Sequence, residues 1–482
     1  MKQYLKKLVM SIAMLLTLTS AYAYDFEVDG IYYEVTSFTD LTCKVVSGDN
    51  KYEGDVTIPS EVSFNSRTLR VTEIGDKAFY ECSSLTSVVI PDSVTEIGDY
   101  AFSRCGSLTS VVIPDSVTVI GNSAFRNCSS LTSVVIGNSV TVIGDSAFRN
   151  CSSLTSVVIP DSVTEIWGYA FDGCSSLTSV VIPDSVTVIG SSAFYGCSSL
   201  TSLVIPDSVT KIWDSAFSGC SSLTSVIISD SVTVIEEYAF SRCSSLTSVV
   251  IPDSVTKIKS YAFKDCSSLT SVVIGNSVNE IESYAFYGCS SLTSLAIGNS
   301  VTYIKYDTFY GCSPLTSLAI SYSTIELKIQ YLVTSLSAIE NLFIDRELDR
   351  RLSLPSLKEL TLGEHVTEVQ IYPTKSESLE SIICYAKEPP TCPEFTNAQY
   401  LNTVVKVPTI SLEKYKRADG WKNFWNLEGF DTGESAVNEV ISDEMKTEIG
   451  RYDINGKSVD ADYNGIVIVR YSDGSTMKIL NK

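Results

Sequence analysis

Histidine is almost missing from this sequence of 482 residues, which contains a single one, His365. Acyl-transfer triads use a histidine as general base, and zinc sites combine histidines with closely paired cysteines. His365 stands alone in the stretch GEHVTEV, and no C-x2-C pair occurs. We therefore expect no catalytic residue, no metal site and no cofactor, and we interpret His365 as a surface residue.

Basic residues are scarce as well. The chain has 35 Lys and Arg against 56 Asp and Glu, which gives a formal net charge of −21. Such an acidic chain repels nucleic acid and anionic membrane surfaces, so neither is an expected partner. Apolar residues make up 44% of the sequence, which indicates a folded protein with a core and not a disordered acidic tail.

Long apolar runs are limited to the first residues. Lys2, Lys6 and Lys7 precede the short apolar stretch 8–18, and Ala-Tyr-Ala at 21–23 has the small-residue pattern of a cleavage site. This arrangement is typical of a secretory signal peptide, and the apolar stretch is too short to span a bilayer comfortably. A buried N-terminal helix is the alternative. We expect a secreted chain without a membrane span after cleavage.

The sequence is rich in an internal repeat that is marked by cysteine. Eleven cysteines, from Cys82 to Cys312, follow one another at intervals of 23 residues. A constant period of this length is the signature of a solenoid or a related repeat architecture. A solenoid also accounts for a length that would otherwise suggest several domains.

Residues 85–107, LTSVVIPDSVTEIGDYAFSRCGS, show what one repeat builds. TSVVI alternates like a short strand, and the Pro-Asp-Ser that follows is a turn sequence in which proline ends the strand. Asp99 is placed to cap a short helix over YAFSRC. Stacked coils would align their strands into a parallel sheet with a spacing of about 4.8 Å. The predicted inward side chains are Leu85, Val88, Ile90, Val94, Ile97, Ala101, Phe102 and Cys105.

The cysteine column has two interpretations. Free cysteine packs as a small apolar residue, which favours a ladder of buried thiols. Neighbouring coils would also bring the cysteines within disulfide range, but stacked side chains point in parallel and eleven is an odd number. We therefore expect reduced thiols in the ladder. Cys384 and Cys392, outside it, are the better candidates for a disulfide.

The motifs IP-x-SV-x-x-I and AF-x-x-C-x-x-L at a 23-residue period closely resemble the BspA-type bacterial surface leucine-rich repeat family, over about residues 24–430. The resemblance implies an α/β-type repeat solenoid of leucine-rich repeats, with a parallel β-sheet and short helices. It also implies a secreted or surface protein that adheres to host matrix proteins or to other bacteria, with protein or glycan partners.

The pattern changes after residue 320. Apolar alternation continues without the cysteine, and EKYKRADGWKNFW then brings bulky aromatic residues that suit either a solenoid cap or an aromatic binding site. The last residues carry the hairpin signals Asn455-Gly456 and Asp473-Gly474, and resemble the C-terminal secretion-signal domains of Bacteroidetes-type bacteria. The predicted parts are a signal peptide (1–23), an N-terminal cap (24–70), a regular solenoid (71–320), degenerate repeats with a C-terminal cap (321–430), a linker (431–436) and a small β-domain serving as a sorting signal (437–482).

Two groups of outward positions are candidate ligand-binding residues. One is an apolar column that runs from Val89 to Ala319 beside an invariant serine, which is either an interaction stripe or simply strand propensity. The other is the variable segment after the second isoleucine, where aromatic side chains suit an interface, although neutral drift explains variation too. The candidates are Val89, Val112, Val135, Val158, Tyr100, Trp167, Tyr169, Trp213, Tyr238, Tyr261 and Tyr284.

The turn PDSV resembles the Asp-Ser acceptor of a Bacteroidetes-type O-glycosylation system. A turn at the solenoid edge should leave its serine hydroxyl accessible, whereas GNSV at Ser139, Ser277 and Ser300 lacks the aspartate. Local turn hydrogen bonding is the alternative explanation. The candidate glycosylation sites are Ser93, Ser116, Ser162, Ser185, Ser208, Ser231 and Ser254.

These observations favour a surface-displayed, adhesin-like binding protein that catalyses nothing. A structural spacer without a specific ligand is the main alternative. A glycan-active solenoid enzyme is a minor one, because such sites need aspartates clustered with lysine or arginine across neighbouring coils, and no spacing here singles out such a cluster.

Overall fold

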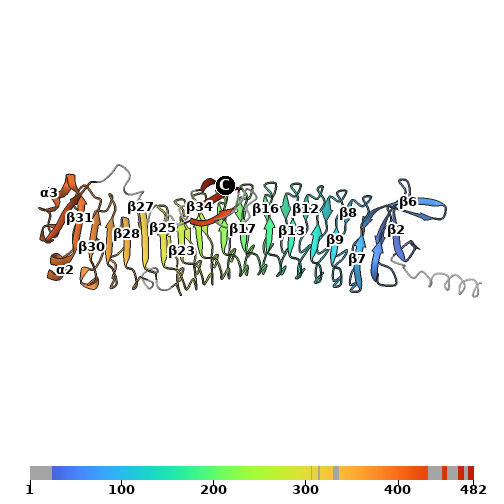
Figure 1. Ribbon diagram of the computed structural model, residues 1–482, viewed down its shortest axis with the longest axis horizontal. Helices are drawn as coiled ribbons and strands as arrows, with labels where there is room; N and C mark the ends of the chain where they lie inside the picture. Colours follow the sequence, from blue (N-terminus) through green and yellow to red (C-terminus); the bar gives the residue numbers. More distant parts are fainter. Residues whose placement is uncertain are drawn as a thin grey trace, which may run out of the picture. The chain divides into compact units, whose positions relative to one another are not determined.

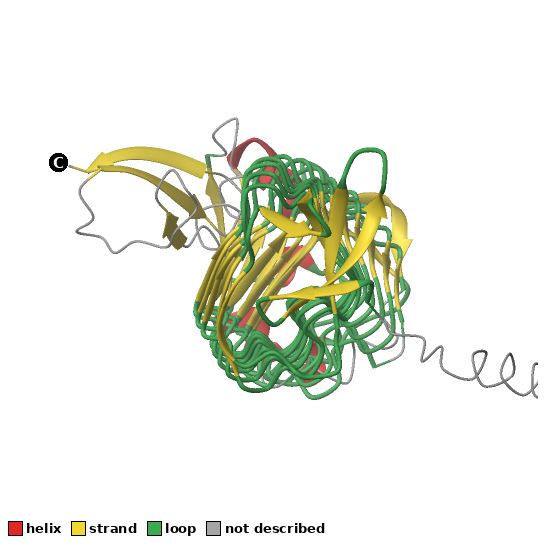
Figure 2. Ribbon diagram, turned by 90° about the vertical axis from the view of Figure 1, so that its right-hand side faces the viewer, coloured by secondary structure: helices red, strands yellow, loops and turns green. Residues whose placement is uncertain are grey.

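The computed structural model describes residues 24–305, 307–312, 315–328, 336–431, 448–452, 465–471 and 476–481. The chain divides into two compact units, residues 1–154 and 155–482. The predicted signal peptide and almost all of the predicted linker lie outside the described residues. Each unit contains stacked coils with strands on two sides and turns between them (Figures 1 and 2).

The first unit opens with a small mixed sheet. Strands β1, β2 and β3 pair antiparallel, β3 pairs parallel with β6, and β5 folds back on β6 as a hairpin. Strand β6 then pairs in parallel with the first coil of the repeat, so this sheet closes the core at the first coil. The strands are β1 (Phe26–Val28), β2 (Ile31–Ser37), β3 (Thr42–Val46), β4 (Gly54–Thr57), β5 (Glu61–Phe64) and β6 (Arg67–Ile74).

Each regular coil contributes two short strands. In the first unit the TSVV segments form β7 (Leu85–Val89), β9 (Ser110–Val112) and β11 (Ser133–Val135), and the second set is β8 (Glu96–Ile97), β10 (Val119–Ile120) and β12 (Val142–Ile143). Coils pair in parallel with identical residues opposite one another, such as Val111 with Val134 and Ile120 with Ile143. A shift of 23 residues therefore maps each coil onto the next.

The second unit repeats this plan. Its first series is β13 (Ser156–Val158), β15 (Ser179–Val181), β17 (Ser202–Val204), β19 (Ser225–Ile227), β21 (Ser248–Ile251), β23 (Ser271–Ile274), β25 (Ser294–Ile297) and β27 (Ser317–Leu327). Its second series is β14 (Glu165–Ile166), β16 (Val188–Ile189), β18 (Lys211–Ile212), β20 (Val234–Ile235), β22 (Lys257–Ile258), β24 (Glu280–Ile281) and β26 (Tyr303–Ile304). Neighbouring strands of the second series pair in parallel throughout.

The predicted inward side chains are confirmed. The eight residues predicted for residues 85–107 are all buried, with Ile90 the most exposed at 7%. The phenylalanines stack face to face along each unit, with ring centroids 5.1 Å apart for Phe102 and Phe125. The core is therefore a set of parallel columns, in each of which one residue type predominates.

The predicted short helix over YAFSRC is absent, and the segment is a run of turns. Ala101, Ser103 and Cys105 donate their amides to carbonyls three residues back, whereas the amides of Tyr100 and Phe102 donate to Asn122 and Ala124 in the next coil. A helix would direct all of these groups along its own axis. Asp99 likewise accepts the amide of Asn122 and does not cap a helix.

The cysteine ladder is buried and reduced. Every described cysteine is a free thiol, including Cys384 and Cys392, so the two better candidates for a disulfide are not bonded to each other. The Cys384 thiol lies 3.1 Å from the Tyr415 hydroxyl instead. In the ladder, the Cys220 thiol donates weakly to the Phe194 carbonyl at 3.4 Å, and burial raises the pKa of Cys220 to about 12.

Beyond residue 320 the first series continues as one parallel sheet. It consists of β27, β28 (Asn341–Leu348), β29 (Glu359–Leu362), β30 (Ser381–Cys384), β31 (Val404–Pro408) and β32 (Asn426–Phe430). Short helices lie between the last strands: η2 (Pro373–Lys375), α2 (Asn397–Asn402), η3 (Thr409–Ser411), α3 (Leu412–Tyr415) and η4 (Trp421–Asn423).

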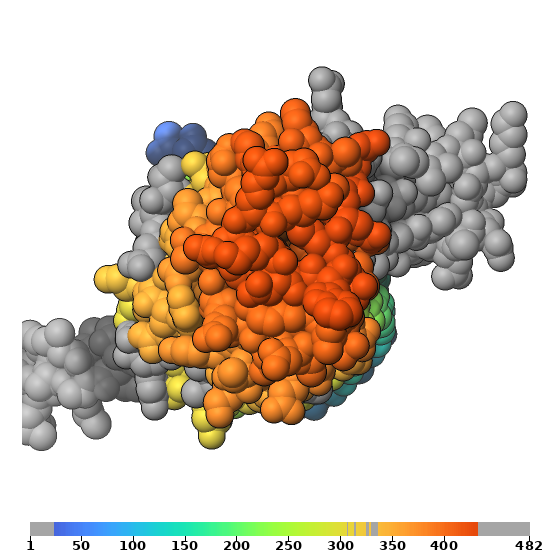
Figure 3. Space-filling model, turned by 90° about the vertical axis from the view of Figure 1, so that its left-hand side faces the viewer, coloured from blue at the N-terminus to red at the C-terminus, as the bar shows by residue number. Residues whose placement is uncertain are grey.

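These last elements close the end of the second unit, where they form the continuous surface drawn in orange-red in Figure 3. Trp421 is fully buried, and its indole N–H donates to the Pro390 carbonyl at 2.7 Å. Phe424 is buried beside it, whereas Trp425 is 79% exposed. Trp421 and Phe424 therefore serve as a cap over the core, which is the first of the two interpretations of this aromatic segment.

The final described strands, β33 (Glu448–Tyr452), β34 (Gly465–Tyr471) and β35 (Thr476–Asn481), pair antiparallel. This pairing sets them apart from the parallel solenoid. The two predicted hairpin turns, at Asn455-Gly456 and Asp473-Gly474, lie outside the described residues.

Candidate binding surfaces

The outward apolar column is exposed only along part of the chain. In the first unit Val89, Val112 and Val135 are 55–60% exposed, and in the second Val158 and Val181 are 75% and 52% exposed. The three exposed valines of the first unit, Val89, Val112 and Val135, are called the valine stripe. Strand alternation places them outward because their neighbours Val88, Val111 and their equivalents fill the core.

The expectation of one exposed apolar column as far as Ala319 is wrong for its last part. Val250, Ala296 and Ala319 are only 6–7% exposed. Ala296 and Ala319 pack with Phe343, which lies directly opposite Ala319 in the next strand. A bulky residue at this position covers its small neighbours, so no stripe is available there.

Hydroxyl groups flank the valine stripe. The Thr132 hydroxyl donates to the Thr109 carbonyl of the preceding coil at 3.0 Å, and the Thr109 hydroxyl donates to the Thr86 carbonyl at 3.5 Å. Ser110 and Ser133 on the same face are exposed. The stripe is therefore an apolar surface with a polar border, of the kind that marks interaction sites.

The aromatic candidates occupy two separate columns. Trp167 and Trp213 directly follow Ile166 and Ile212 and are 43% and 40% exposed. The tyrosines lie two positions further, and all of them have positive φ: Tyr100, Tyr169, Tyr238, Tyr261 and Tyr284. A positive φ at a tyrosine is uncommon, and here it is the third residue of a tight turn that every coil repeats.

Three of these tyrosines form a continuous stack. The ring centroids of Tyr238 and Tyr261 lie 4.8 Å apart, and those of Tyr261 and Tyr284 lie 5.1 Å apart, with the rings nearly parallel. Stacking covers most ring faces, so a ligand meets mainly ring edges along this stack. Tyr100 belongs to the first unit, where the Lys77 ammonium lies 5.9 Å from its ring centroid.

Sequence reasoning missed a third aromatic column. Tyr195 and Tyr310 are 40% and 57% exposed, and Tyr287 stacks on Tyr310 at 5.7 Å. Each of these tyrosines directly follows the phenylalanine of its coil, a position where other coils carry serine, arginine, lysine or aspartate. The variability of the residue after this phenylalanine is the sequence signal that could have revealed the third aromatic column.

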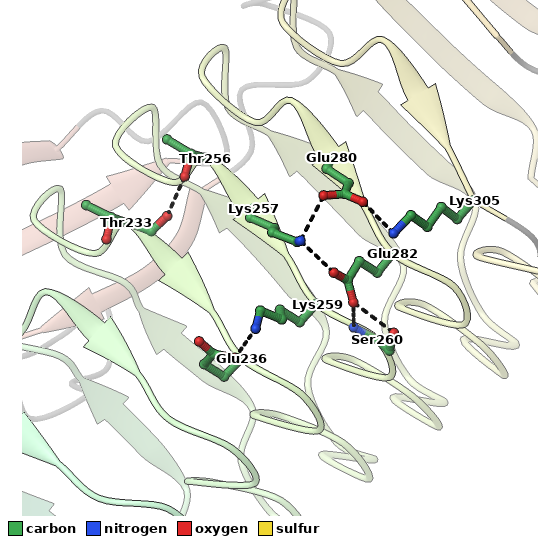
Figure 4. A network of polar contacts seen from close by, with 9 residues as sticks. All are labelled: Thr233, Glu236, Thr256, Lys257, Lys259, Ser260, Glu280, Glu282 and Lys305. Carbon is green, nitrogen blue, oxygen red and sulfur yellow. Dashed lines mark hydrogen bonds and ion pairs between the residues drawn. The ribbon is translucent and has the colours of Figure 1, made fainter.

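Charged side chains form a ladder on the second strand series of the second unit (Figure 4). Glu236 accepts Lys211 at 2.7 Å and Lys259 at 2.9 Å. Lys257 donates to both Glu280 and Glu282 at 2.8 Å. The paired glutamates and lysines sit in neighbouring coils, so the ladder ties one coil to the next. It was not predicted, although opposite charges about 23 residues apart were visible in the sequence.

The ladder lowers the pKa values of its glutamates. Burial alone would raise the pKa of Glu236, but the hydrogen bonds from Lys211 and Lys259 outweigh it, so the pKa of Glu236 lies below its usual value. Hydrogen bonds from Lys257 and Lys305 lower the pKa of Glu280. The ladder is thus charged at neutral pH and acts as a structural clamp.

The lone histidine lies on the surface, as expected. The His365 side chain is 47% exposed, its Nδ1 is 3.1 Å from the buried carboxylate of Asp345, and its ring stacks on Tyr322. Such a pair could orient a catalytic base, but in the described residues no hydroxyl or thiol is hydrogen-bonded to its Nε2. No cluster of metal-binding side chains occurs among the described residues either.

The turn serines are less accessible than expected. Ser93 is only 6% exposed. The hydroxyls of Ser185 and Ser254 each donate at 2.7 Å to a valine carbonyl of the preceding coil, and Ser116 and Ser208 do the same. The premise that the turn hydroxyls need no partner is therefore wrong for these four serines, because the stacked coil supplies one, whereas the Ser93 hydroxyl is buried without a partner among the described residues. The exposed serines are Ser139 and Ser277, which lack the preceding aspartate.

Comparisons with known proteins find a matching family model and similar solved structures. The model of the BspA type leucine rich repeat region matches residues 60–178, 164–292 and 235–350, together more than half of the chain. A leucine-rich repeat protein from Bacteroides ovatus is similar, with 26% identity and a TM-score of 0.56, over 85% of this chain and 100% of that one.

A leucine rich cell surface protein from Faecalibacterium prausnitzii is 29% identical over 74% of this chain and 94% of that one, with a TM-score of 0.49. A search of curated proteins returned no match. Among the helices of the described residues, none is long and apolar enough to cross a membrane. The repeat, its parallel coils and the matching family model lead to one conclusion: the chain belongs to the BspA-type leucine-rich repeat family.

Proposed function

We propose that this protein is a secreted or surface-displayed binding protein that recognises host or bacterial partners through the valine stripe and catalyses nothing. The observation that carries the proposal is the stripe itself. In three successive coils of the first unit, a valine is 55–60% exposed between a buried column and a polar border. A solvated structural face would gain solubility from polar residues at these positions, so a retained apolar column is best explained by a partner.

The rest of the chain supports a role outside the cell. Its signal-peptide pattern predicts export, and the family to which it belongs is typical of bacterial surfaces. We propose that residues 437–482 are a sorting signal, since the antiparallel strands β33–β35 differ from the parallel solenoid.

The valine stripe can be tested by charge. The full chain is immobilised and probed with matrix proteins and with glycans, and Val89, Val112 and Val135 are then replaced together by aspartate. Truncation or disruption of central interface residues commonly costs about 2 kcal/mol or more of binding free energy, so a loss of about 30-fold or more in affinity is expected. Thermal melting should barely shift, because these side chains are exposed.

Val119 provides the matched control. It is also an exposed valine, at 39%, but it lies in β10 of the other strand series. Val119→Asp should leave partner binding unchanged. Equal losses from both variants, or an unchanged affinity in the triple variant for every partner found, would favour the structural-spacer alternative.

A further inference from the structure

Trp167 and Trp213 flank a coil that has no side chain at the same position. Ile166, Ile189 and Ile212 are opposite one another in β14, β16 and β18. The residues that follow them are therefore successive rungs of one column, Trp167, Gly190 and Trp213. With a strand spacing of about 4.8 Å, the two tryptophan positions are separated by two rungs, about 9.6 Å.

Gly190 cannot be replaced without moving the backbone. A Cβ at this position would lie 2.6 Å from the Gly168 amide nitrogen and 2.7 Å from the Trp167 carbonyl carbon. The Gly190 amide donates to the Ile166 carbonyl at 2.8 Å, which holds the two coils together at this point. The rung between the tryptophans therefore carries no side chain.

Both indoles are held in place by residues of their own coils. The Trp167 Nε1–H donates to the Glu165 carboxylate at 2.7 Å. The Lys211 ammonium lies 4.0 Å from the centre of the Trp213 ring and is itself paired with Glu236. Each indole nevertheless remains at least 40% exposed. Aromatic groups fixed in advance lose little conformational entropy when a ligand stacks on them.

The surroundings of the two indoles are polar. Tyr169 adds a third ring that is 40% exposed, and its amide donates to the Ser191 carbonyl at 3.0 Å. The Glu165 carboxylate contacts the Trp167 indole, and Ser191 and Asp214 directly follow Gly190 and Trp213 in the sequence. The central residues of a protein–protein interface are usually surrounded by groups that exclude water, which differs from the polar surroundings of these indoles. Flat aromatic faces mixed with carboxylates and hydroxyls instead suit a sugar, whose C–H face packs on a ring while its hydroxyls donate to carboxylates.

We propose that Trp167, Gly190 and Trp213 form a platform for a neutral, extended β-1,4-linked glycan. In such a chain every second sugar presents the same face, and the length of a disaccharide is close to two rungs of the solenoid. Sugars stack on the two indoles, and the sugar between them crosses Gly190. Glu165 and Asp214 disfavour an anionic glycan. This site is formed by other residue columns than the valine stripe, so the glycan proposal does not depend on the function proposed for the stripe.

The test uses the full chain and three probes, cellohexaose, β-1,4-mannohexaose and N-acetylchitohexaose, with α-linked maltohexaose for comparison. Binding is followed by calorimetry and by tryptophan fluorescence. We expect saturable binding of at least one β-linked probe and at least tenfold weaker binding of maltohexaose. Trp167→Ala and Trp213→Ala should each weaken the β-linked probe at least tenfold, whereas Trp213→Tyr should retain most of the binding.

Trp425→Ala is the matched control, since this tryptophan of the cap is 79% exposed and lies next to another element, β32. Its binding of the probe should equal that of the unchanged chain, and circular dichroism should be the same for all variants. Failure of all three β-linked probes to bind at millimolar concentration would overturn the proposal. Equal losses of probe binding in the Trp167, Trp213 and Trp425 variants would also overturn it. The same holds for a Trp213→Ala variant that loses binding of a protein partner and keeps binding of the probe.

Discussion

The charge ladder in Figure 4 allows a prediction with a worked magnitude, for the substitution Glu236→Gln. The Glu236 side chain is 8% exposed, and its partners Lys211 and Lys259 are 35% and 32% exposed. Exposed ion pairs contribute about 0–1 kcal/mol, and removal of one partner from a fully buried pair costs about 3–5 kcal/mol. The Glu236 clamp lies between these cases, so the substitution should cost about 2 kcal/mol.

The same clamp should depend on pH. The pKa of Glu236 is lowered in the folded state, so its contribution is complete above the unfolded value of about 4.3 and is lost as the pH falls through the folded pKa. The variant lacks this titration. The difference in stability between the unchanged chain and Glu236→Gln should therefore be full at about pH 6 and should shrink as the pH is lowered below about 4.

Hydrogen exchange is the suitable assay, because a repeat protein need not unfold in a single step. The amides of Glu236 and Lys259 donate to carbonyls of the preceding coils, at 3.0 and 2.9 Å, and report directly on this region. Glu237→Gln is the control, since this neighbouring glutamate is exposed. A cost for Glu237→Gln equal to that of Glu236→Gln, or a difference that stays constant down to about pH 3, would refute the reasoning.

Three other parts of the chain give further predictions. Thiol titration in denaturant without reductant should find at least eleven reactive thiols, and in the native state almost none, because burial keeps the ladder protonated and inaccessible; a denatured count near two would contradict the thiol ladder. Deletion of residues 437–482 should leave the melting of the solenoid unchanged and should trap the protein in the periplasm, so normal surface display of the shortened chain would argue against a sorting signal. The seven PDSV and SDSV serines stay predicted glycosylation sites, so protein purified from its own host should have an intact mass above that of the unmodified chain. A mass equal to that of the unmodified chain would contradict glycosylation.

Local rules are sufficient to predict the core. The 23-residue period fixes which residues recur, and strand alternation fixes which of them face inward, so Leu85, Phe102 and Cys105 are expected in the core, and all three are buried. The turn run after Asp99 is not predictable in this way. Its residues have the spacing of a helix, but the choice between helix and turns depends on amides that bond to the next coil.

The candidate surfaces are predictable only in part. The exposure of Val89 and Val112 follows from alternation, whereas the burial of Ala319 depends on Phe343, a residue from an irregular coil. The turn serines illustrate the same limit. PDSV has the pattern of an exposed turn, but the acceptor of the Ser185 hydroxyl is the Val163 carbonyl, 22 residues away. Contacts between coils decide such details, and a single repeat contains no sign of them.

The alternating signs of the charge ladder have a consequence for the order in which coils assemble. The apolar columns are so uniform that a coil left out of the stack would still allow its neighbours to pack. The residues after the in-register isoleucines are Glu236, Lys259, Glu282 and Lys305. Omission of the Lys259 coil would bring Glu236 against Glu282, and omission of the next would bring Lys259 against Lys305. Like charges in partly buried positions repel each other. The charge ladder therefore disfavours a stack that lacks one coil, whereas the uniform apolar core does not distinguish it from the complete stack.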